Sequence, residues 1–348
     1  RHMSHARYGP RGALSVGSLP CGPRDSITDV GGVTVGHATI NRGDVHTGVT
    51  VVRPCEGPVL ARRPVAAAHV LNGFGKTCGL VQVSELGCLE TPIALTNTLC
   101  VGRVADALVT HALREAGESG LPLPTTVNPV VGETNDGRIN DIRNRSIGEE
   151  DVLAAIGAAG PDFARGGVGA GRGTVCFGLK GGIGSASRLA RVDERDYIVG
   201  VLVQSNFGRM PDLMVEGKPV GRRIAEELGA VDRPERGSIM VVVATDAPLS
   251  SRQLGRVVRR ATVGLVRCGS YMGHGSGDVF VGFTTANSMG TERGQGLVRL
   301  DCLAEEGLDP LFRACAEACE AAVLDSLMEA EPMRGLDGTI YHSLREYL

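Results

Sequence analysis

The sequence predicts an α+β fold made of stacked sheets and helices, and three observations carry this prediction. Short apolar runs bounded by Gly, Pro and Asn recur along the 348 residues, as expected of strands. Other segments repeat apolar residues at the spacing of amphipathic helices. Strands and helices show little strict alternation, which favours a layered sandwich over a doubly wound parallel sheet.

The first part of the chain should contain a sheet with a helix packed on it. Residues 1–26 are rich in Gly, Pro and Ser and are expected to run over the surface, starting with a cloning remnant at Arg1-His2-Met3. A meander of paired strands is predicted at 33–38, 48–52, 66–71 and 80–83. The apolar period then changes to that of a helix over 97–113.

The middle of the chain combines polar and glycine-rich segments. The polar stretch 122–144 is long for a connection inside a compact domain, so we expect it to be functional. Residues 146–159 predict a helix in which Ser146 and Glu149 form a capping box. The glycine-dense segment 165–187 leads into a predicted central strand at 197–204.

The last part of the chain alternates helical and strand patterns around one very apolar strand. Predicted helices lie at 220–228, 250–267 and 308–330, and predicted strands at 238–245 and 279–284. The strand Ser238–Thr245, SIMVVVAT, is the most hydrophobic of the chain, and a polar linker at 231–236 precedes it. Pro332 should end the last helix.

Composition excludes several classes of partner. A net charge of −3 and a pI near 6.3 do not favour a nucleic acid or an anionic membrane surface. No apolar run approaches the roughly 20 residues that span a bilayer, and no charged-then-apolar signal segment is seen, so we expect a cytoplasmic protein. With no Trp and only 3% aromatic residues, stacking sites for bases or sugars are not expected.

The ten cysteines do not form a metal-binding pattern. They lack CxxC pairs and Cys/His spacing typical of zinc, so we interpret them as reduced residues of the core. Cys315 and Cys319 lie four apart on a predicted helix, where buried packing is the preferred interpretation. No metal and no other cofactor is expected.

Two glycine-rich segments do not meet the requirements of a nucleotide site. Asn72–Thr77 ends like a phosphate-binding loop, but that motif needs glycine where this chain has Val70. In segment 165–187 the third glycine of a dinucleotide fingerprint is replaced by Arg172, which favours a structural turn. A histidine-based hydrolase is also disfavoured, because no histidine lies in a known motif; His274, near Ser276, is the best candidate.

The junction of Gly237 and Ser238 joins the polar linker to the most apolar strand. The Gly-Ser dipeptide alone carries no information, since it recurs at 17, 184, 269 and 275. A serine hydroxyl needs a base, and a free α-amino group, with a pKa of about 7.7–8.0, could be that base on its own residue. Cutting the preceding peptide bond would expose this amine. We attribute the glycine to a strained backbone that lets the hydroxyl reach the preceding carbonyl.

Segments along nearly the whole chain, from about residue 27 to the end, resemble one family. Arg236–Leu249 (RGSIMVVVATDAPL) resembles the cleavage site of the DmpA-type aminopeptidases, which include the β-peptidyl aminopeptidases. Five more segments resemble the family in the same order: 71–77 (LNGFGKT), 91–101 (TPIALTNTLCV), 129–134 (PVVGET), 204–208 (QSNFG) and 275–278 (GSGD). The resemblance implies a four-layer α/β/β/α sandwich formed by a single domain at 27–348, with chains 1–237 and 238–348 after self-cleavage, and a homotetramer.

The resemblance also implies roles for individual residues. By position, Ser238 is the nucleophile, Asn206 is the side chain of the oxyanion hole, and Ser276 and Asp278 lie near the freed amine of Ser238. Glu133 is the candidate partner of the substrate's ammonium group, with the capping of a turn as the alternative.

Asn135 marks a departure from the family. Some members have a Tyr there, whose hydroxyl assists the oxyanion or the leaving group, and this puts the substrate range in question.

These implications predict an autoprocessed serine aminopeptidase. Its substrates would be peptides, amides or esters of small free amino-terminal residues of the L-, D- or β-amino acid type. The alternatives are a self-cleaving acyltransferase of the ornithine acetyltransferase type and a non-catalytic homologue. Those acyltransferases use threonine as nucleophile, so Ser238 argues against the first alternative. An uncut chain would support the second.

Overall fold

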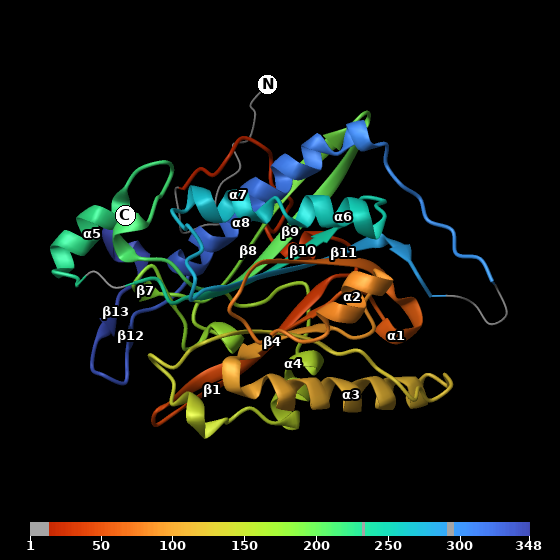
Figure 1. Cartoon of the computed structure of the whole chain (residues 1–348), viewed down its shortest axis with the longest axis horizontal. Helices are drawn as coiled ribbons and strands as arrows, with labels where there is room; N and C mark the ends of the chain where they lie inside the picture. Colours follow the sequence, from red (N-terminus) through yellow and green to blue (C-terminus); the bar gives the residue numbers. More distant parts are fainter. Residues whose placement is uncertain (1–13, 232–233, 291–295) are drawn as a thin grey trace.

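The computed structural model describes residues 14–231, 234–290 and 296–348, and Figure 1 shows two sheets between layers of helices. The four-stranded sheet has the order β1-β2-β4-β5, and the five-stranded sheet the order β3-β11-β10-β9-β8. The first contains β1 (Thr34–Arg42), β2 (Val45–Arg53), β4 (Ile93–Asn97) and β5 (Val130–Thr134). The second contains β3 (Pro64–Gly73), β8 (Ile183–Val192), β9 (Arg195–Asn206), β10 (Ser238–Thr245) and β11 (Gly277–Ser288).

Helices cover the outer face of each sheet. The four-stranded sheet packs against α3 (Val101–Glu118) and α4 (Glu149–Gly157). The five-stranded sheet packs against α6 (Ser251–Val258), α7 (Ala261–Arg267) and α8 (Asp309–Met328). The predicted α+β class and the four-layer α/β/β/α order are therefore confirmed.

Short elements complete the described part of the chain. The remaining helices are α1 (Val59–Arg62), α2 (Leu80–Leu86) and α5 (Val220–Leu228). Two small hairpins are formed by β6 (Val175–Cys176) with β7 (Leu179–Lys180), and by β12 (Met333–Arg334) with β13 (Ile340–Tyr341). Turns of 3-10 helix lie at 27–29, 98–100, 142–144, 169–171, 210–212, 305–307 and 344–347.

The strand β10 is the centre of the five-stranded sheet, and all eight of its residues are buried. Val241 and Val243 belong to the core beneath the helices, whereas Met240 and Val242 belong to the core between the sheets. Burial on both faces explains why this strand is continuously apolar instead of alternating. The predicted central strand 197–204 is interior, as β9, one place from the centre.

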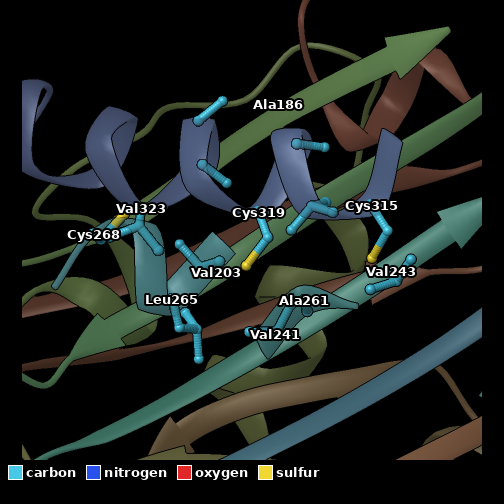
Figure 2. Packing of buried hydrophobic residues seen from close by; sticks show 14 of the residues in the cluster. Ala186, Val203, Val241, Val243, Ala261, Leu265, Cys268, Cys315, Cys319 and Val323 are labelled. Carbon is cyan, nitrogen blue, oxygen red and sulfur yellow. The ribbon is translucent and has the colours of Figure 1, made fainter. Parts of the chain in front are cut away.

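Small side chains allow α8 to lie close to its neighbours. Figure 2 shows Cys315 and Cys319 on the face of α8 that packs against β10 and α7. A Cβ atom at Gly264 of α7 would lie 2.7 Å from the Cβ atom of Cys319, so the two helices meet at a glycine. Burial raises the pKa of the Cys315 thiol to about 12. The predicted packing role of these two cysteines is confirmed.

Several predicted elements differ in the structure. Residues 80–83 form the helix α2 and not a strand, because Gly79 and Gly87, both with positive φ, bound a single short helix. A four-residue apolar run cannot by itself distinguish the two. The run 66–71 is a strand, β3, but it pairs with β11 in the other sheet, so of the predicted meander only the pairing of the first two strands, β1 and β2, is confirmed.

The polar stretch 122–144 contains the fully buried strand β5, which the sequence analysis missed. The helix predicted from Ser146 begins at Glu149, because Asp151, rather than Glu149, accepts a hydrogen bond from the Gly148 N–H, at 2.8 Å.

Two more differences concern a predicted helix and the N-terminal arm. The helix predicted at 250–267 is two helices, α6 and α7, which are separated at residues 259 and 260. The arm was expected to run over the surface, but its described part contributes Leu14 and Val16 to the core. Arg1-His2-Met3 lies outside the described residues.

Candidate active site

Ser238 is the first residue of β10, and the two strands beside it supply its neighbours. The register places Ser238 opposite Asn206, the last residue of β9, and beside Gly277, the first residue of β11. Ser238 is only 4% exposed. The interior of the sheet thus fixes the serine backbone, while its side chain lies at the edge of a pocket.

Two N–H groups donate hydrogen bonds to the Ser238 hydroxyl. The side-chain amide of Asn206 donates from Nδ2 at 3.2 Å, and the backbone N–H of Asn135 donates at 3.3 Å. The orientation of the Asn206 amide is set by its Oδ1, which accepts the Val175 N–H at 3.0 Å. In acyl transfer the negative charge develops on the carbonyl oxygen next to the attacking oxygen, so two N–H groups this close to the Ser238 oxygen lie where they can reach that charge.

Gly237 is pressed against the end of β9. A Cβ atom at this position would lie 2.5 Å from the Cα atom of Phe207, so no other residue fits without movement of the backbone. The Gly237 carbonyl accepts the Gly277 N–H at 3.2 Å. Its φ is not in the left-handed region, so close approach explains the glycine, and the strained backbone inferred from the sequence is wrong.

Ser276 and Asp278 lie on either side of Gly277. The Ser276 hydroxyl donates to Asp278 Oδ1 at 2.8 Å. Burial raises the pKa of the Asp278 carboxyl to about 6; the Ser276 hydrogen bond opposes the rise, and the charge of Glu235 adds to it. Asp278 Oδ2 is buried with no hydrogen-bond partner among the described residues. Among the described residues, no hydrogen bond joins either side chain to the Ser238 hydroxyl, and the pair has one acceptor atom, Asp278 Oδ2, that is not used.

Glu133 belongs to β5 and lies on the pocket wall, with 3% of its surface exposed. Its Oε1 accepts the Lys76 N–H at 2.9 Å, and its Oε2 accepts the Thr98 hydroxyl. The carboxylate therefore fastens two segments of the wall. The two sequence interpretations of Glu133, a structural and a substrate-binding role, are compatible in this position.

The Asn135 side chain forms its hydrogen bond within its own segment. It is exposed, and its Oδ1 accepts the Gly137 N–H at 3.0 Å. Only the backbone N–H of Asn135 reaches Ser238. This donor is independent of the side chain, so an N–H group lies beside the Ser238 hydroxyl whatever residue except proline stands at position 135.

A pocket of about 840 Å³ joins these groups. Its wall includes four residues named from the sequence: Ser238, Asn206, Glu133 and Asn135. The apolar side chain of Phe74 and residues 339–342, around β13, also line it. Asp278 and Ser276 are not part of its wall. The four lining residues were named from the sequence, but the contribution of the last hairpin was not.

Sequence reasoning missed two buried ionisable groups behind the site. Asp136, next to Asn135, accepts hydrogen bonds from Thr47 at 2.6 Å and Asn140 at 2.9 Å, and burial raises the pKa of its carboxyl to about 6. Lys180 donates to three backbone carbonyls, and burial, assisted by Arg172, lowers the pKa of its ammonium to about 7. The sequence signal that could have indicated the buried ammonium group is a lysine, Lys180, inside the glycine-dense segment 165–187.

Among the described residues, no hydrogen bond joins the other candidates from the sequence to Ser238. His274 is exposed, and its ring lies 6.1 Å from the ring of Phe74. The glycines of segment 165–187 serve close packing: a Cβ atom at Gly184 would lie 1.9 Å from the Ala322 carbonyl oxygen of α8.

The described residues form neither a cluster of metal ligands nor a helix that could span a membrane. Within 14–231, 234–290 and 296–348, three His, Cys, Asp or Glu side chains do not gather as they would around a metal ion. In the same ranges, every helix is too short or too polar to cross a bilayer.

Comparison with known proteins gives consistent matches over most of the chain. A sequence model of peptidase family S58 matches residues 25–341. The chain is 39% identical over 342 residues to the beta-peptidyl aminopeptidase BapA of Sphingosinicella microcystinivorans, covering 91% of this chain and 84% of that protein.

Solved structures agree with this match. A protein of Pyrococcus horikoshii OT3 is similar with a TM-score of 0.89 and 44% identity, covering 95% of this chain and 94% of that one. The L-aminopeptidase D-Ala-esterase/amidase of Ochrobactrum anthropi has a TM-score of 0.86 and 32% identity, covering 94% of this chain and 93% of that one. That enzyme is described as a prototype of the serine aminopeptidases and a new variant of the Ntn hydrolase fold.

Proposed function

The chain belongs to peptidase family S58 and is an aminopeptidase, and on that premise we propose that it cuts itself between Gly237 and Ser238 and then uses Ser238 as nucleophile. One observation carries the proposal. The Ser238 hydroxyl receives two N–H donors, while Gly237 is held in a space that only glycine fits.

Self-cleavage is an acyl shift followed by hydrolysis. The Ser238 oxygen attacks the Gly237 carbonyl carbon, its proton passes to the departing nitrogen, and the C–N bond breaks. An ester then links Gly237 to the Ser238 oxygen, and the α-amine of Ser238 is free. Water hydrolyses the ester, which leaves a carboxylate on Gly237 and restores the hydroxyl.

The freed amine then acts as the general base for substrate hydrolysis. With a pKa of about 7.7–8.0, an α-amino group is substantially neutral near pH 8 and can take the proton of its own hydroxyl. The Asn135 N–H and the Asn206 amide would stabilise the oxyanion. Asp278 Oδ2, which lacks a partner among the described residues, would accept a hydrogen bond from the new amino terminus. We therefore expect kcat/KM to rise toward about pH 8 as this amine loses its proton, and to fall at higher pH as the substrate's own ammonium group loses its proton.

The substrates we propose are amides of small residues with a free amino group. Glu133 would bind the substrate ammonium at the pocket wall, as a carboxylate does best. The relatives act on beta-peptidyl substrates in one case and on L-amino acid and D-Ala derivatives in another, by their names. A panel of L-, D- and β-alanyl anilides would rank these three types for this chain.

Intact mass spectrometry tests the proposal. Wild-type protein should give fragments that end at Gly237 and begin at Ser238, and Ser238→Ala should remain whole and lose at least about 10³-fold in activity. Ser18→Ala is the control: it changes the serine of another Gly-Ser pair, which is distant from Ser238 in the sequence, and this variant should cleave normally. A wild-type chain that never splits, or activity that survives Ser238→Ala, would exclude this mechanism.

Assembly and location are further parts of the proposal. The family resemblance supports a homotetramer of cleaved pairs, which light scattering would detect as about four times 36.3 kDa. All ten cysteines are without disulfides, which supports a reducing compartment such as the cytoplasm. Cell fractionation would test this location.

A further inference from the structure

Glu235 is a buried carboxylate in a linker whose neighbouring residues are exposed. Pro234 and Arg236 are exposed, whereas Glu235 is only 7% exposed. A glutamate is seldom buried unless hydrogen bonds compensate for the loss of water. This one lies three residues before Ser238, on the other side of the bond that the proposed function cuts.

The Glu235 carboxylate fastens the linker to both sides of the site. Its Oε1 accepts the Gly208 N–H at 3.2 Å, and its Oε2 accepts the Gly273 N–H at 3.1 Å. The Ser270 hydroxyl lies 3.5 Å from Oε1. Gly208 follows the end of β9, and Gly273 precedes β11, so the carboxylate bridges the segments that flank β10.

The backbone around Glu235 lies beside the segment that leads into β11. A Cβ atom at Gly275 would lie 3.4 Å from the Glu235 carbonyl oxygen and 3.6 Å from the Cα atom of Arg236. Two residues after Glu235, the Gly237 carbonyl accepts the Gly277 N–H at 3.2 Å. The segment before the cut is therefore held at two points, one carboxylate and one carbonyl.

We propose that Glu235 is a positioning residue for self-cleavage, which holds the Gly237 carbonyl where the Ser238 hydroxyl can attack it. The inference rests on the proposed function. Ser238 is fixed by β10 on one side of the bond, and without Glu235 the other side would be held by the Gly277 N–H alone, with an exposed linker before it. A displacement of about 1 Å between reacting groups can cost about 100-fold in rate.

Hydrolysis of substrates needs different groups. Once the bond is cut, the carbonyl that is attacked belongs to the substrate, and Asn206, Asn135 and Glu133 remain in place on other segments. Glu235 should therefore affect the rate of cleavage strongly and the kcat of the cleaved enzyme weakly. This separation distinguishes a positioning role from general damage to the fold.

The experiment follows cleavage of the full-length chain after cell-free synthesis, by denaturing gel over time. Glu235→Ala should slow cleavage about 10- to 100-fold. Glu235→Gln keeps one acceptor oxygen but turns an NH2 group toward a backbone N–H, so its rate should be intermediate. Once cleaved, each variant should have a kcat within about threefold of wild type, measured per free Ser238.

Glu317 provides a matched control. It is also a buried carboxylate, and its Oε2 accepts the Ser18 and Leu19 N–H groups at 3.0 and 2.9 Å, in a part of the fold outside the pocket. Glu317→Ala should lower Tm without changing the cleavage rate. If Glu317→Ala slows cleavage as much as Glu235→Ala, the effect is general destabilisation and the inference is wrong.

Each remaining outcome decides one point. Cleavage of Glu235→Ala at the wild-type rate would overturn the inference and leave the proposed function intact. A wild-type chain that never cleaves would instead remove the proposed function, and the inference with it. If Glu235→Ala does not fold, Glu235→Gln decides: an unchanged rate contradicts the inference, and a slowed rate with normal Tm supports it.

Discussion

The middle and the beginning of β10 are equally buried but differ in chemistry. In the middle, Val241 and Val243 pack with α7 and α8 in an apolar core (Figure 2). At the beginning, Ser238 is surrounded by buried polar side chains, among them Asn206 and Asp278, and one of their oxygen atoms has no partner among the described residues. One strand thus has an apolar, tightly packed centre and a polar end that faces the candidate site.

This difference separates two kinds of mutational effect. Removing an apolar side chain from the middle should reduce stability and leave the chemistry unchanged, because no reacting group is touched. Removing a polar side chain at the beginning should reduce activity and can leave stability unchanged or increase it, because the fold bears a cost for burying that group. The following variants test this separation, in order of expected effect.

Asn206→Ala should have the largest effect on activity, a loss of about 10²- to 10³-fold in kcat, because it removes one of the proposed oxyanion donors. Steady-state kinetics of the cleaved enzyme measure it. The Val175 N–H also loses its acceptor, so Asn206→Asp is the matched control, which retains that acceptor without the donor. Recovery of wild-type kcat in Asn206→Asp would show that the amide donor is not needed.

Leu265→Ala should cost about 2–5 kcal/mol of unfolding free energy, because this side chain of α7 is fully buried in the apolar core. Urea unfolding measures the loss, and kcat should stay within about twofold. Val263, on the same helix, is 41% exposed, and Val263→Ala should cost far less. A large fall in kcat for Leu265→Ala at a temperature where the protein is folded would break the separation.

Asp278→Asn should stabilise the uncut chain at neutral pH. The pKa of Asp278 is raised to about 6, so the folded state favours the protonated form. Wild-type stability from this group is fully present below about pH 4 and is lost as pH rises toward 6, by up to about 3 kcal/mol. Thermal unfolding from pH 4 to 8, in the Ser238→Ala background, measures the difference.

The cleaved enzyme provides the contrast for Asp278. If the freed amine pairs with Asp278, the charged carboxylate gains a partner, and Asp278→Asn should then be neutral or destabilising at pH 7. An equal gain from Asp278→Asn in the cut and uncut proteins would argue against that pairing.

Glu133→Gln should have the smallest effect, a rise of about tenfold in KM for substrates with a free amine, equal to about 1.4 kcal/mol, with a smaller change in kcat. Glu90→Gln is the control, since Glu90 is a buried carboxylate outside the pocket that accepts the Asn128 N–H at 2.7 Å. Equal KM values for Glu133→Gln and wild type would remove the ammonium-binding role.

The accuracy of the sequence prediction varied with how far each element depends on distant residues. Helix 220–228 and strand 238–245 are found with the predicted bounds, because their apolar patterns are complete within the segment. Residues 80–83 were assigned to a strand instead of a helix, since a short apolar run has no period. The strand β5 was missed, since its pairing with β4 stabilises it rather than a pattern of its own.

The candidate site shows the same dependence. Ser238 and Asn206 were named from motifs, and the register of β9 and β10 places them opposite each other. The backbone donor of Asn135 was not predicted, because every residue except proline has a backbone N–H and the residue type therefore gives no signal. The carboxylate of Glu235 was not predicted either, because it binds segments about 27 and 38 positions away in the sequence.

The sequence alone determined the α+β class, the very apolar strand β10 and the junction before it, since hydrophobic period and local composition are properties of the chain itself. Only the tertiary structure decided which sheet each strand joins, why Gly237 must be glycine, and which N–H groups meet at the Ser238 hydroxyl. These depend on distances between residues remote in sequence, which packing fixes and local pattern does not.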